Sequence, residues 1–270
     1  MYHYDTFIEI GDSHKVCEDY IIQGNSPIPY IILADGCSSS EDTEMGARIL
    51  CHLAKQYLSL YVDTINGIDY KKMGSWIIHN AETVSRHLGL RKSCLDATLI
   101  VALNLGYAFR VYVYGDGVIF TENKHETHNN DITMNEVSFT QNAPYYLSYL
   151  IDSYKDEQYH NLKTEKHITT IVDCANTRAE FTDVEAYDHE TVFTFLKEEI
   201  SKVIVCSDGI KSFLYDQTPV HPGDFINDMV AFKNMKGKFL KRRLNKLMKE
   251  LNNSGVLHYD DLSIGAFIEE

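Results

Sequence analysis

Four pairs of residues, far apart in the sequence, carry groups able to bind a cation. They are Glu18-Asp19, Asp35-Gly36, Asp208-Gly209 and Asp260-Asp261. Each pair lies at the start or the end of an apolar, strand-like run. Asp and Glu are depleted inside strands and common in turns, so a turn explains any single pair. All four together indicate one site if the fold brings these strand ends to the same edge.

Clustered carboxylates are typical of a site for hard divalent cations. Without a cation they repel one another, and their pKa values rise. Oxygen ligands favour Mg²⁺ or Mn²⁺ over zinc or copper. Two such ions about 3.5–4 Å apart can activate a water and hold a transferring phosphoryl group. Gly36 fits this chemistry, because a residue without a side chain lets its carbonyl oxygen approach an ion.

The stretch GDSHKVCEDY (residues 11–20) places Glu18 and Asp19 close to His14, Lys15 and Cys17. A solvated turn explains this composition, and so does one wall of a metal site. The other three pairs favour the second interpretation, in which Glu18 and Asp19 face the ions.

The net charge of the 270 residues is −14. This argues against a nucleic-acid partner, because a phosphate backbone requires clustered Lys and Arg. One basic segment departs from the overall balance. A solvated helix face over an apolar stripe explains it more simply than an anchor for an acidic partner does. Its basic residues are Lys233, Lys236, Lys238, Lys241, Arg242, Arg243, Lys246 and Lys249.

The six cysteines form no CxxC pair and no zinc-type spacing. Residues 1–5 lack the basic start and apolar core of a signal peptide. No apolar run approaches the ~20 residues that a membrane span needs. We therefore expect a cytoplasmic protein with no membrane partner, whose cysteines pack as small apolar residues.

Apolar patterning places the candidate residues on strands and helices. The run Tyr30–Ala34 predicts a buried strand that ends at Asp35. Helical spacing follows over about 45–58 and again over about 71–88. In the second helix, the residues expected to face inward are Trp76, Ile77, Ala81, Val84 and Leu88.

Further strands are expected at 97–103, 109–114, 202–206 and 262–268. Gly115-Asp116-Gly117 is typical of a tight hairpin turn, which would join 109–114 to an antiparallel partner at 118–120. An amphipathic helix is expected from Phe232 to Leu251. Residues 121–199 are polar, and most of them carry no pattern that assigns an element. The order of elements predicts one α+β domain over residues 1–270, with antiparallel sheet.

The order of these motifs resembles the metal-dependent serine/threonine protein phosphatases of the PP2C type. Within them it resembles a bacterial branch whose opening motif is G-x-S-H followed by a carboxylate pair. Each motif alone is common, but the ordered set is specific and spans nearly the whole chain. The matching residues are Gly11-Asp12-Ser13-His14, Glu18-Asp19, Ala34-Asp35-Gly36, Gly46-Ala47-Arg48, Asp96-Ala97-Thr98, Gly115-Asp116-Gly117, Ser207-Asp208-Gly209 and Asp260-Asp261-Leu262-Ser263.

The resemblance implies an αββα sandwich, in which pairs of helices flank two antiparallel sheets. It implies two Mn²⁺ or Mg²⁺ ions in the cleft between the sheets. It also implies hydrolysis of phosphoserine and phosphothreonine by direct attack of a metal-bridging water. The variable, flap-type region of the family falls within about 121–199.

By position, the resemblance implies that Asp35 bridges both ions and that Gly36 offers its carbonyl oxygen. Asp208 and Asp260 would hold one ion. Asp261 stands where relatives often have Asn, which makes Asp260 the expected direct ligand.

Glu18 and Asp19 would act on the other ion, mostly through water. Many relatives have a phosphate-binding Arg four residues before this Glu, whereas this chain has His14, as the G-x-S-H branch does. His cannot make the bidentate contact of Arg. Two interpretations stay open: His14 contacts the phosphate or acts as a general acid, or it only closes the turn.

Two other positions depart from the family pattern. Cys37 follows Asp35-Gly36 where eukaryotic members often have a His proposed as the leaving-group acid, and packing explains Cys37 more simply. Asp116 is interpreted as a structural turn residue. Residues 139–144 offer no convincing ligand for the third, weaker ion that many members bind, so a third ion is not expected.

The predicted function is a metal-dependent protein phosphatase that acts on a phosphorylated protein, with a cognate Ser/Thr kinase as the partner that the family suggests. The alternative is a pseudophosphatase that binds phosphoproteins without turnover. The missing Arg and the missing His favour this alternative, whereas the retained groups at the six principal metal positions argue against it.

Overall fold

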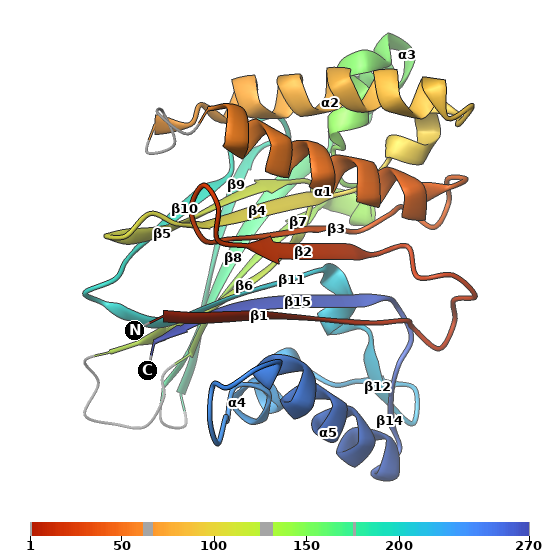
Figure 1. The fold of residues 1–270 in the computed structure, drawn as a ribbon. Helices are drawn as coiled ribbons and strands as arrows, with labels where there is room; N and C mark the ends of the chain where they lie inside the picture. The colour runs from red at the N-terminus through yellow and green to blue at the C-terminus, as the bar shows by residue number, and fades with distance from the viewer. Residues whose placement is uncertain (1, 62–66, 125–131, 175–176, 270) are drawn as a thin grey trace.

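The computed structural model describes residues 2–61, 67–124, 132–174 and 177–269. Two β-sheets lie face to face in the middle of the molecule (Figure 1). Helices α1 (Thr43–Leu60) and α2 (Tyr70–His87) cover the outer face of one sheet, and α4 (Ile226–Met229) and α5 (Phe239–Asn253) cover the other. The predicted αββα sandwich is confirmed.

The larger sheet has seven strands in the order β1-β15-β11-β6-β7-β8-β9, and all neighbours are antiparallel. Tyr2 pairs with Glu269, so the described ends of the chain lie side by side at one end of the sheet (Figure 1). The strands are β1 (Tyr2–Glu9), β6 (Gly117–Asn123), β7 (Ile132–Phe139), β8 (Glu165–Cys174), β9 (Thr177–Ala186), β11 (Ile200–Cys206) and β15 (Leu262–Glu269).

The second sheet has five strands in the order β10-β5-β4-β3-β2, again with antiparallel neighbours. They are β2 (Tyr20–Gly24), β3 (Tyr30–Ala34), β4 (Leu99–Asn104), β5 (Ala108–Tyr114) and β10 (Val192–Leu196). A small third sheet consists of β12 (Phe213–Tyr215), β13 (Thr218–Pro219) and β14 (Val256–His258).

Strand β3 contributes to two apolar layers at once, and all five of its residues are buried. Ile31 and Leu33 pack in the core between the sheets with residues such as Phe267. Ile32 and Ala34 pack in the core beneath α1 and α2. Alternation between two apolar layers explains why the run is apolar throughout. The strand is held on both faces, so the position of Asp35 at its end is well determined.

Helix α2 starts with a side-chain cap, because Asp69 Oδ1 accepts a hydrogen bond of 2.8 Å from the backbone N of Lys72. Its buried stripe includes Ile77 and Ala81, as predicted. The expectation that Val84 and Leu88 face inward is wrong, since their exposed fractions are 37% and 56%. Val84 lies beside the buried stripe, and Leu88 follows the last helical residue.

The hairpin predicted at Gly115-Asp116-Gly117 is also wrong. Strand β5 belongs to the five-stranded sheet and β6 to the seven-stranded sheet, so this turn carries the chain from one sheet to the other. Gly115 (φ 89°) and Gly117 (φ 146°) adopt backbone conformations that favour glycine. The turn residues indicate a sharp change of direction, but they do not specify whether the flanking strands pair.

The long basic helix begins later than predicted. Phe232 and Met235 precede α5, although they pack against the same core as its apolar face. Gly237 has a left-handed backbone (φ 60°), which interrupts the helical spacing. At the first turn of α5, the buried carboxylate of Asp5 accepts a hydrogen bond of 2.8 Å from Leu240 N.

The outward face of α5 carries exposed basic side chains such as Lys241, Lys246 and Lys249, while Leu244 and Leu247 are buried. This agrees with a solvated basic face over an apolar stripe. None of the helices in the described residues is long and apolar enough to cross a membrane.

The stretch 121–199, mostly unassigned from sequence, forms the outer strands of both sheets. Strands β7, β8 and β9 extend the seven-stranded sheet, and β10 completes the five-stranded one. Between β7 and β8 lies a compact connection, which we call the 140–161 segment. It contains the short helices η3 (Thr140–Asn142) and η4 (Leu147–Ile151) and helix α3 (Ser153–Asn161).

Candidate metal centre

The strand ends of both sheets supply one group of carboxylates. In the five-stranded sheet, Asp35 follows β3 and Asp19 precedes β2. In the seven-stranded sheet, Asp208 lies two residues after β11 and Asp260 two residues before β15. The charges of Asp19 and Asp208 act on Asp35, and that of Asp208 acts on Asp260. The structure thus brings together four carboxylates that the sequence assigned to one site.

Burial and mutual repulsion oppose ionisation of this group. Burial raises the pKa of Asp35 well above its usual range, and the charges of Asp19 and Asp208 raise it further. Burial raises the pKa of Asp19 to about 7. Burial and the charge of Asp208 also raise the pKa of Asp260. A divalent cation would offset both penalties, so this arrangement favours cation binding.

Two buried carboxylate oxygens in this region have no hydrogen-bond partner within the described ranges: Glu18 Oε2 and Asp19 Oδ1. The other carboxylate oxygen of Asp19 accepts a bond of 2.8 Å from Ser207 Oγ. A buried carboxylate oxygen without a donor is costly. A hard cation such as Mn²⁺ or Mg²⁺ would satisfy both atoms, so the residues present fit such an ion.

The turn after Asp35 requires glycine. A Cβ on Gly36 would lie 2.8 Å from Thr43 Cβ and 3.0 Å from the carbonyl oxygen of Glu18. Thr98 holds the preceding peptide, because its N donates to Asp35 O (2.8 Å) and its Oγ1 accepts from Asp35 N (3.2 Å). Close packing therefore keeps the Gly36 peptide next to the carboxylates.

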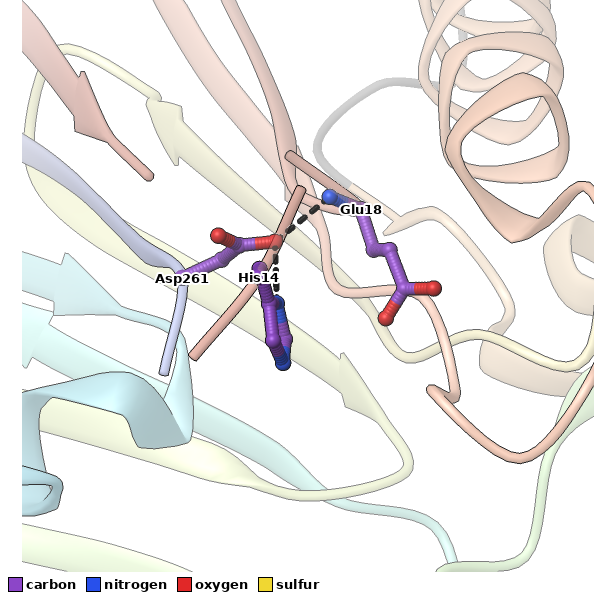
Figure 2. Close-up of side chains that lie close together, drawn as sticks. All are labelled: His14, Glu18 and Asp261. Atoms are coloured by element: carbon purple, nitrogen blue, oxygen red, sulfur yellow. Dashed lines mark hydrogen bonds and ion pairs between the residues drawn. The ribbon is translucent and has the colours of Figure 1, made fainter. Parts of the chain in front are cut away.

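Asp261 holds the 11–18 loop in place (Figure 2). Its Oδ1 accepts a hydrogen bond of 2.8 Å from Gly11 N. Its Oδ2 accepts from Glu18 N (2.5 Å) and lies 2.9 Å from His14 Nδ1. A carboxylate oxygen of Glu18, a ring nitrogen of His14 and a carboxylate oxygen of Asp261 lie within 4.8 Å of one another. His14, Glu18 and Asp261 lie close enough to suggest a metal site, but the Asp261 oxygens already have donors.

This engagement of Asp261 leaves Asp260 as the better candidate for a direct ligand. The Asp260 side chain is 44% exposed. Its Oδ1 accepts a bond of 2.9 Å from Asp261 N and lies 3.5 Å from His14 Nε2.

His14 lies between the carboxylates of Asp260 and Asp261, and its side chain is 18% exposed. Burial lowers its pKa, but the hydrogen bond and charge of Asp261, with the charges of Asp260 and Glu18, outweigh burial and raise the pKa overall. The protonated ring is thus favoured. His14 closes the turn, because its backbone N donates a bond of 3.0 Å to Gly11 O, and its ring lies beside Asp260 at the edge of the site.

Asp116, interpreted from the sequence as a turn residue, lies in the same acidic group. Burial and the charge of Asp208 raise its pKa to about 8. Lys211 places its ammonium 2.9 Å from Glu136 Oε1 and interacts with the charges of Asp208 and Asp116. Sequence reasoning missed Lys211 and Glu136, because neither lies in a motif. The position of Lys211 three residues after Asp208 is the only signal that the sequence offers.

Tyr146 brings the 140–161 segment close to the candidate metal site. This tyrosine is 8% exposed, and its hydroxyl interacts with Cys37 and with the charges of Asp116 and Asp35. The sequence favours packing as the role of the tyrosines at 145–149. Ring contacts among Tyr145, Tyr149 and Tyr159 agree with that interpretation, but Tyr146 also faces the candidate site.

A cavity of about 540 Å³ lies between this segment, α2 and the 187–191 loop. Its lining includes Tyr70, Tyr145 and Tyr187 but none of the predicted metal ligands. The predicted metal ligands therefore do not line this cavity, although Gly115, which precedes Asp116, does.

A family model described as Protein phosphatase 2C matches residues 10–249. The chain belongs to the protein phosphatase 2C family. This confirms the family that the motif order predicted. Among curated proteins, no sequence matches the chain.

Solved structures of protein phosphatase 2C-type enzymes share the fold at low identity. Serine/threonine phosphatase Stp1 from Staphylococcus aureus has a TM-score of 0.57 and 14% identity, covering 100% of this chain and 96% of that chain. The Mycobacterium tuberculosis phosphatase PstP/Ppp has a TM-score of 0.53 and 14% identity, with 100% and 99% coverage. The catalytic domain of PstP in complex with two manganese ions has a TM-score of 0.52 and 13% identity, with 99% and 97% coverage.

Proposed function

We propose that this protein phosphatase 2C family member is a single-domain, metal-dependent phosphatase that hydrolyses phosphoserine and phosphothreonine in proteins. One observation carries the proposal: carboxylates at the strand ends of both sheets lie together, the pKa values of Asp35, Asp19 and Asp260 are raised, and the unpartnered oxygens of Glu18 and Asp19 suit divalent cations. The two manganese ions in the PstP structure support a dinuclear centre.

In the proposed site, Asp35 lies at the end of β3, between the other carboxylates, and Gly36 would offer its carbonyl oxygen to an ion. Asp208 and Asp260 would hold one ion, and Glu18 and Asp19 would act on the other. Two bound ions, Mn²⁺ or Mg²⁺, would acidify a coordinated water and neutralise charge on the transferring phosphoryl group.

The chain's own residues fix this geometry before any ligand binds. Ser207 Oγ orients Asp19. Asp261 ties the peptide of Glu18 to the start of β15. His14 is held beside Asp260, so its imidazolium can donate a hydrogen bond to a phosphate oxygen or a proton to the leaving group. No phosphorylated side chain is required in this mechanism.

A phosphorylated protein is the proposed substrate, with a Ser/Thr kinase as the enzyme that supplies it. The named serine/threonine phosphatases with this fold support that class of substrate. We place the reaction in the cytoplasm on the cysteine pattern. The pseudophosphatase alternative has less support, because all six metal positions keep suitable groups.

Turnover of p-nitrophenyl phosphate with Mn²⁺, Mg²⁺ or EDTA tests the proposal. We expect metal-dependent hydrolysis that EDTA abolishes and that Asp35→Ala lowers at least ~100-fold. The control is Asp183→Ala, an exposed carboxylate on β9, which should keep wild-type activity. Full activity of folded Asp35→Ala would exclude the proposed site.

A further inference from the structure

Asp96 connects the loop that follows Gly36 to the 140–161 segment, although it is not one of the proposed metal ligands. It follows the short helix η2 (Lys92–Leu95), and it is 3% exposed. Three side chains donate to its carboxylate: Ser40 Oγ to Oδ2 (2.8 Å), Lys155 Nζ to Oδ2 (2.5 Å) and Ser148 Oγ to Oδ1 (2.7 Å). Both carboxylate oxygens of Asp96 thus accept hydrogen bonds from side chains elsewhere in the fold.

The bond from Ser40 connects Asp96 to the turn that follows β3, residues 35–40, which we call the metal turn. Ser40 belongs to the loop that follows Gly36, and the backbone oxygen of Asp96 accepts a bond of 2.9 Å from Cys37 N. Residues 36 and 97 also form an isolated β-bridge. Asp96 therefore holds both ends of the 37–40 loop and limits the movement of the Gly36 peptide.

The other connection leads to the 140–161 segment. Ser148 lies in η4 and Lys155 in α3. A second tie runs in parallel, because Lys92 Nζ donates to the backbone oxygen of Ile151 (2.8 Å). The segment held in this way places Tyr146 against Cys37, beside the carboxylates. It is therefore positioned to touch a phosphorylated protein that enters the site, whereas a small aryl phosphate would not reach most of it.

A buried carboxylate that loses its cationic partner is strongly disfavoured. Lys155 of the segment therefore stabilises the Asp96 carboxylate, and the same carboxylate holds Ser40 of the metal turn. A change in the position of the segment would thus affect the turn through Asp96. Ser40 and Lys155 share the same oxygen atom, so removing either changes the environment of the other.

We infer that Asp96 is a positioning residue that couples the 140–161 segment to the metal turn, and that Lys155 and Ser148 thereby set the affinity for phosphorylated protein substrates. This inference rests on the proposed phosphatase function. It gives a role to the Asp96-Ala97-Thr98 motif, which supplies none of the proposed metal ligands.

Lys155→Met is the first test, because its side chain is 32% exposed and the variant should fold. We expect KM for a phosphothreonine peptide to rise about fivefold or more. At saturating Mn²⁺, we also expect kcat to stay within about twofold, with both constants for p-nitrophenyl phosphate unchanged. Lys202→Met is the matched control, because it removes a comparable 2.6 Å ion pair, with Glu122. Equal peptide KM values for the two variants would overturn the inference.

A double-mutant cycle tests the coupling itself. Ser40→Ala should raise the Mn²⁺ dissociation constant measured by calorimetry a fewfold, while the thermal midpoint shows that the variant is folded. The effects of Ser40→Ala and Lys155→Met on peptide KM should then be clearly non-multiplicative, because both donors use Oδ2. Multiplicative effects would mean that Asp96 does not couple the two parts. A wild-type protein without Mn²⁺-dependent turnover would instead overturn the proposed function.

Discussion

At the scale of single residues, the dominant feature is a group of acidic side chains whose negative charge Lys211 and His14 only partly offset. Burial raises the pKa of Asp19 to about 7 and, with the charge of Asp208, raises that of Asp116 to about 8, from an ordinary 3.8. The metal-free folded protein therefore holds protons that the unfolded chain has already released near neutral pH.

The metal-free protein should lose stability as the pH rises. A raised carboxyl pKa contributes stability that is fully present below about pH 4 and is lost through about pH 7–8. In EDTA, we expect the free energy of unfolding to fall by on the order of 2 kcal/mol between pH 6 and pH 8. Denaturant unfolding at both pH values measures this. Asp116→Asn should reduce the difference, and saturating Mn²⁺ should remove it. An equal free energy at both pH values in EDTA would contradict the electrostatic description.

Lys211 is the second residue-scale test, because its ammonium lies among Glu136, Asp116 and Asp208. Replacing it by Met leaves the acidic group more negative. We expect the metal-free thermal midpoint to fall and Mn²⁺ to bind about tenfold more tightly. Calorimetry and thermal unfolding in EDTA measure the two opposite changes. Lys202→Met should produce neither tightening nor a comparable loss of the midpoint, and weaker Mn²⁺ binding by Lys211→Met would rule out this role.

At the scale of elements, the site depends on how closely two turns of the seven-stranded sheet approach each other. Gly209 follows Asp208, and a Cβ there would lie 1.9 Å from the backbone oxygen of Asp261. Ser207 Oγ also accepts a bond from Ser263 N (3.0 Å). These contacts hold the turn after β11 against the start of β15.

Gly209→Ala should therefore destabilise the protein by about 2–4 kcal/mol, because backbone and not a flexible side chain blocks the new methyl group. It should also weaken Mn²⁺ binding, since Asp208 and Asp260 would shift relative to each other. Denaturant unfolding and calorimetry check both effects. Gly67→Ala is the control, because a Cβ added at Gly67 would have no described atom within 4 Å. A stable Gly209→Ala variant with normal Mn²⁺ affinity would show that this approach is not required.

The elements also show what the sequence could predict. Asp35 was located correctly because a continuous apolar run ends directly before it. The pairing across Gly115-Asp116-Gly117 was mispredicted, because turn residues do not reveal which sheet each strand joins. Most of 121–199 stayed unassigned because β9 is largely exposed, so that it lacks a clear apolar alternation. No local pattern marks Lys211, which acts through tertiary contacts. Asp96 belongs to a recognised motif, but its bonds to Ser148 and Lys155 are tertiary contacts that the motif does not reveal.

At the scale of the whole molecule, the candidate centre joins the two sheets. Asp35 and Asp19 belong to the five-stranded sheet, and Asp208 and Asp260 to the seven-stranded one. Between these ends the sheets share an apolar core that includes Leu33, Val205 and Phe267. Apolar packing holds the sheets together along their faces, while a cation would hold them at the carboxylate edge. Cation binding and the alignment of the sheets are thus linked.

Release of phosphate from a phosphothreonine peptide, measured against Mn²⁺ concentration for wild type and Asp208→Asn, tests this account most directly. We predict saturable, Mn²⁺-dependent turnover by the wild type. In Asp208→Asn we predict at least a ~100-fold loss, because a ligand from one of the two sheets is impaired while the volume of the side chain is kept. Turnover by the wild type that persists in EDTA, or an Asp208→Asn variant with the wild-type Mn²⁺ dependence, would contradict a catalytic metal centre between the two sheets.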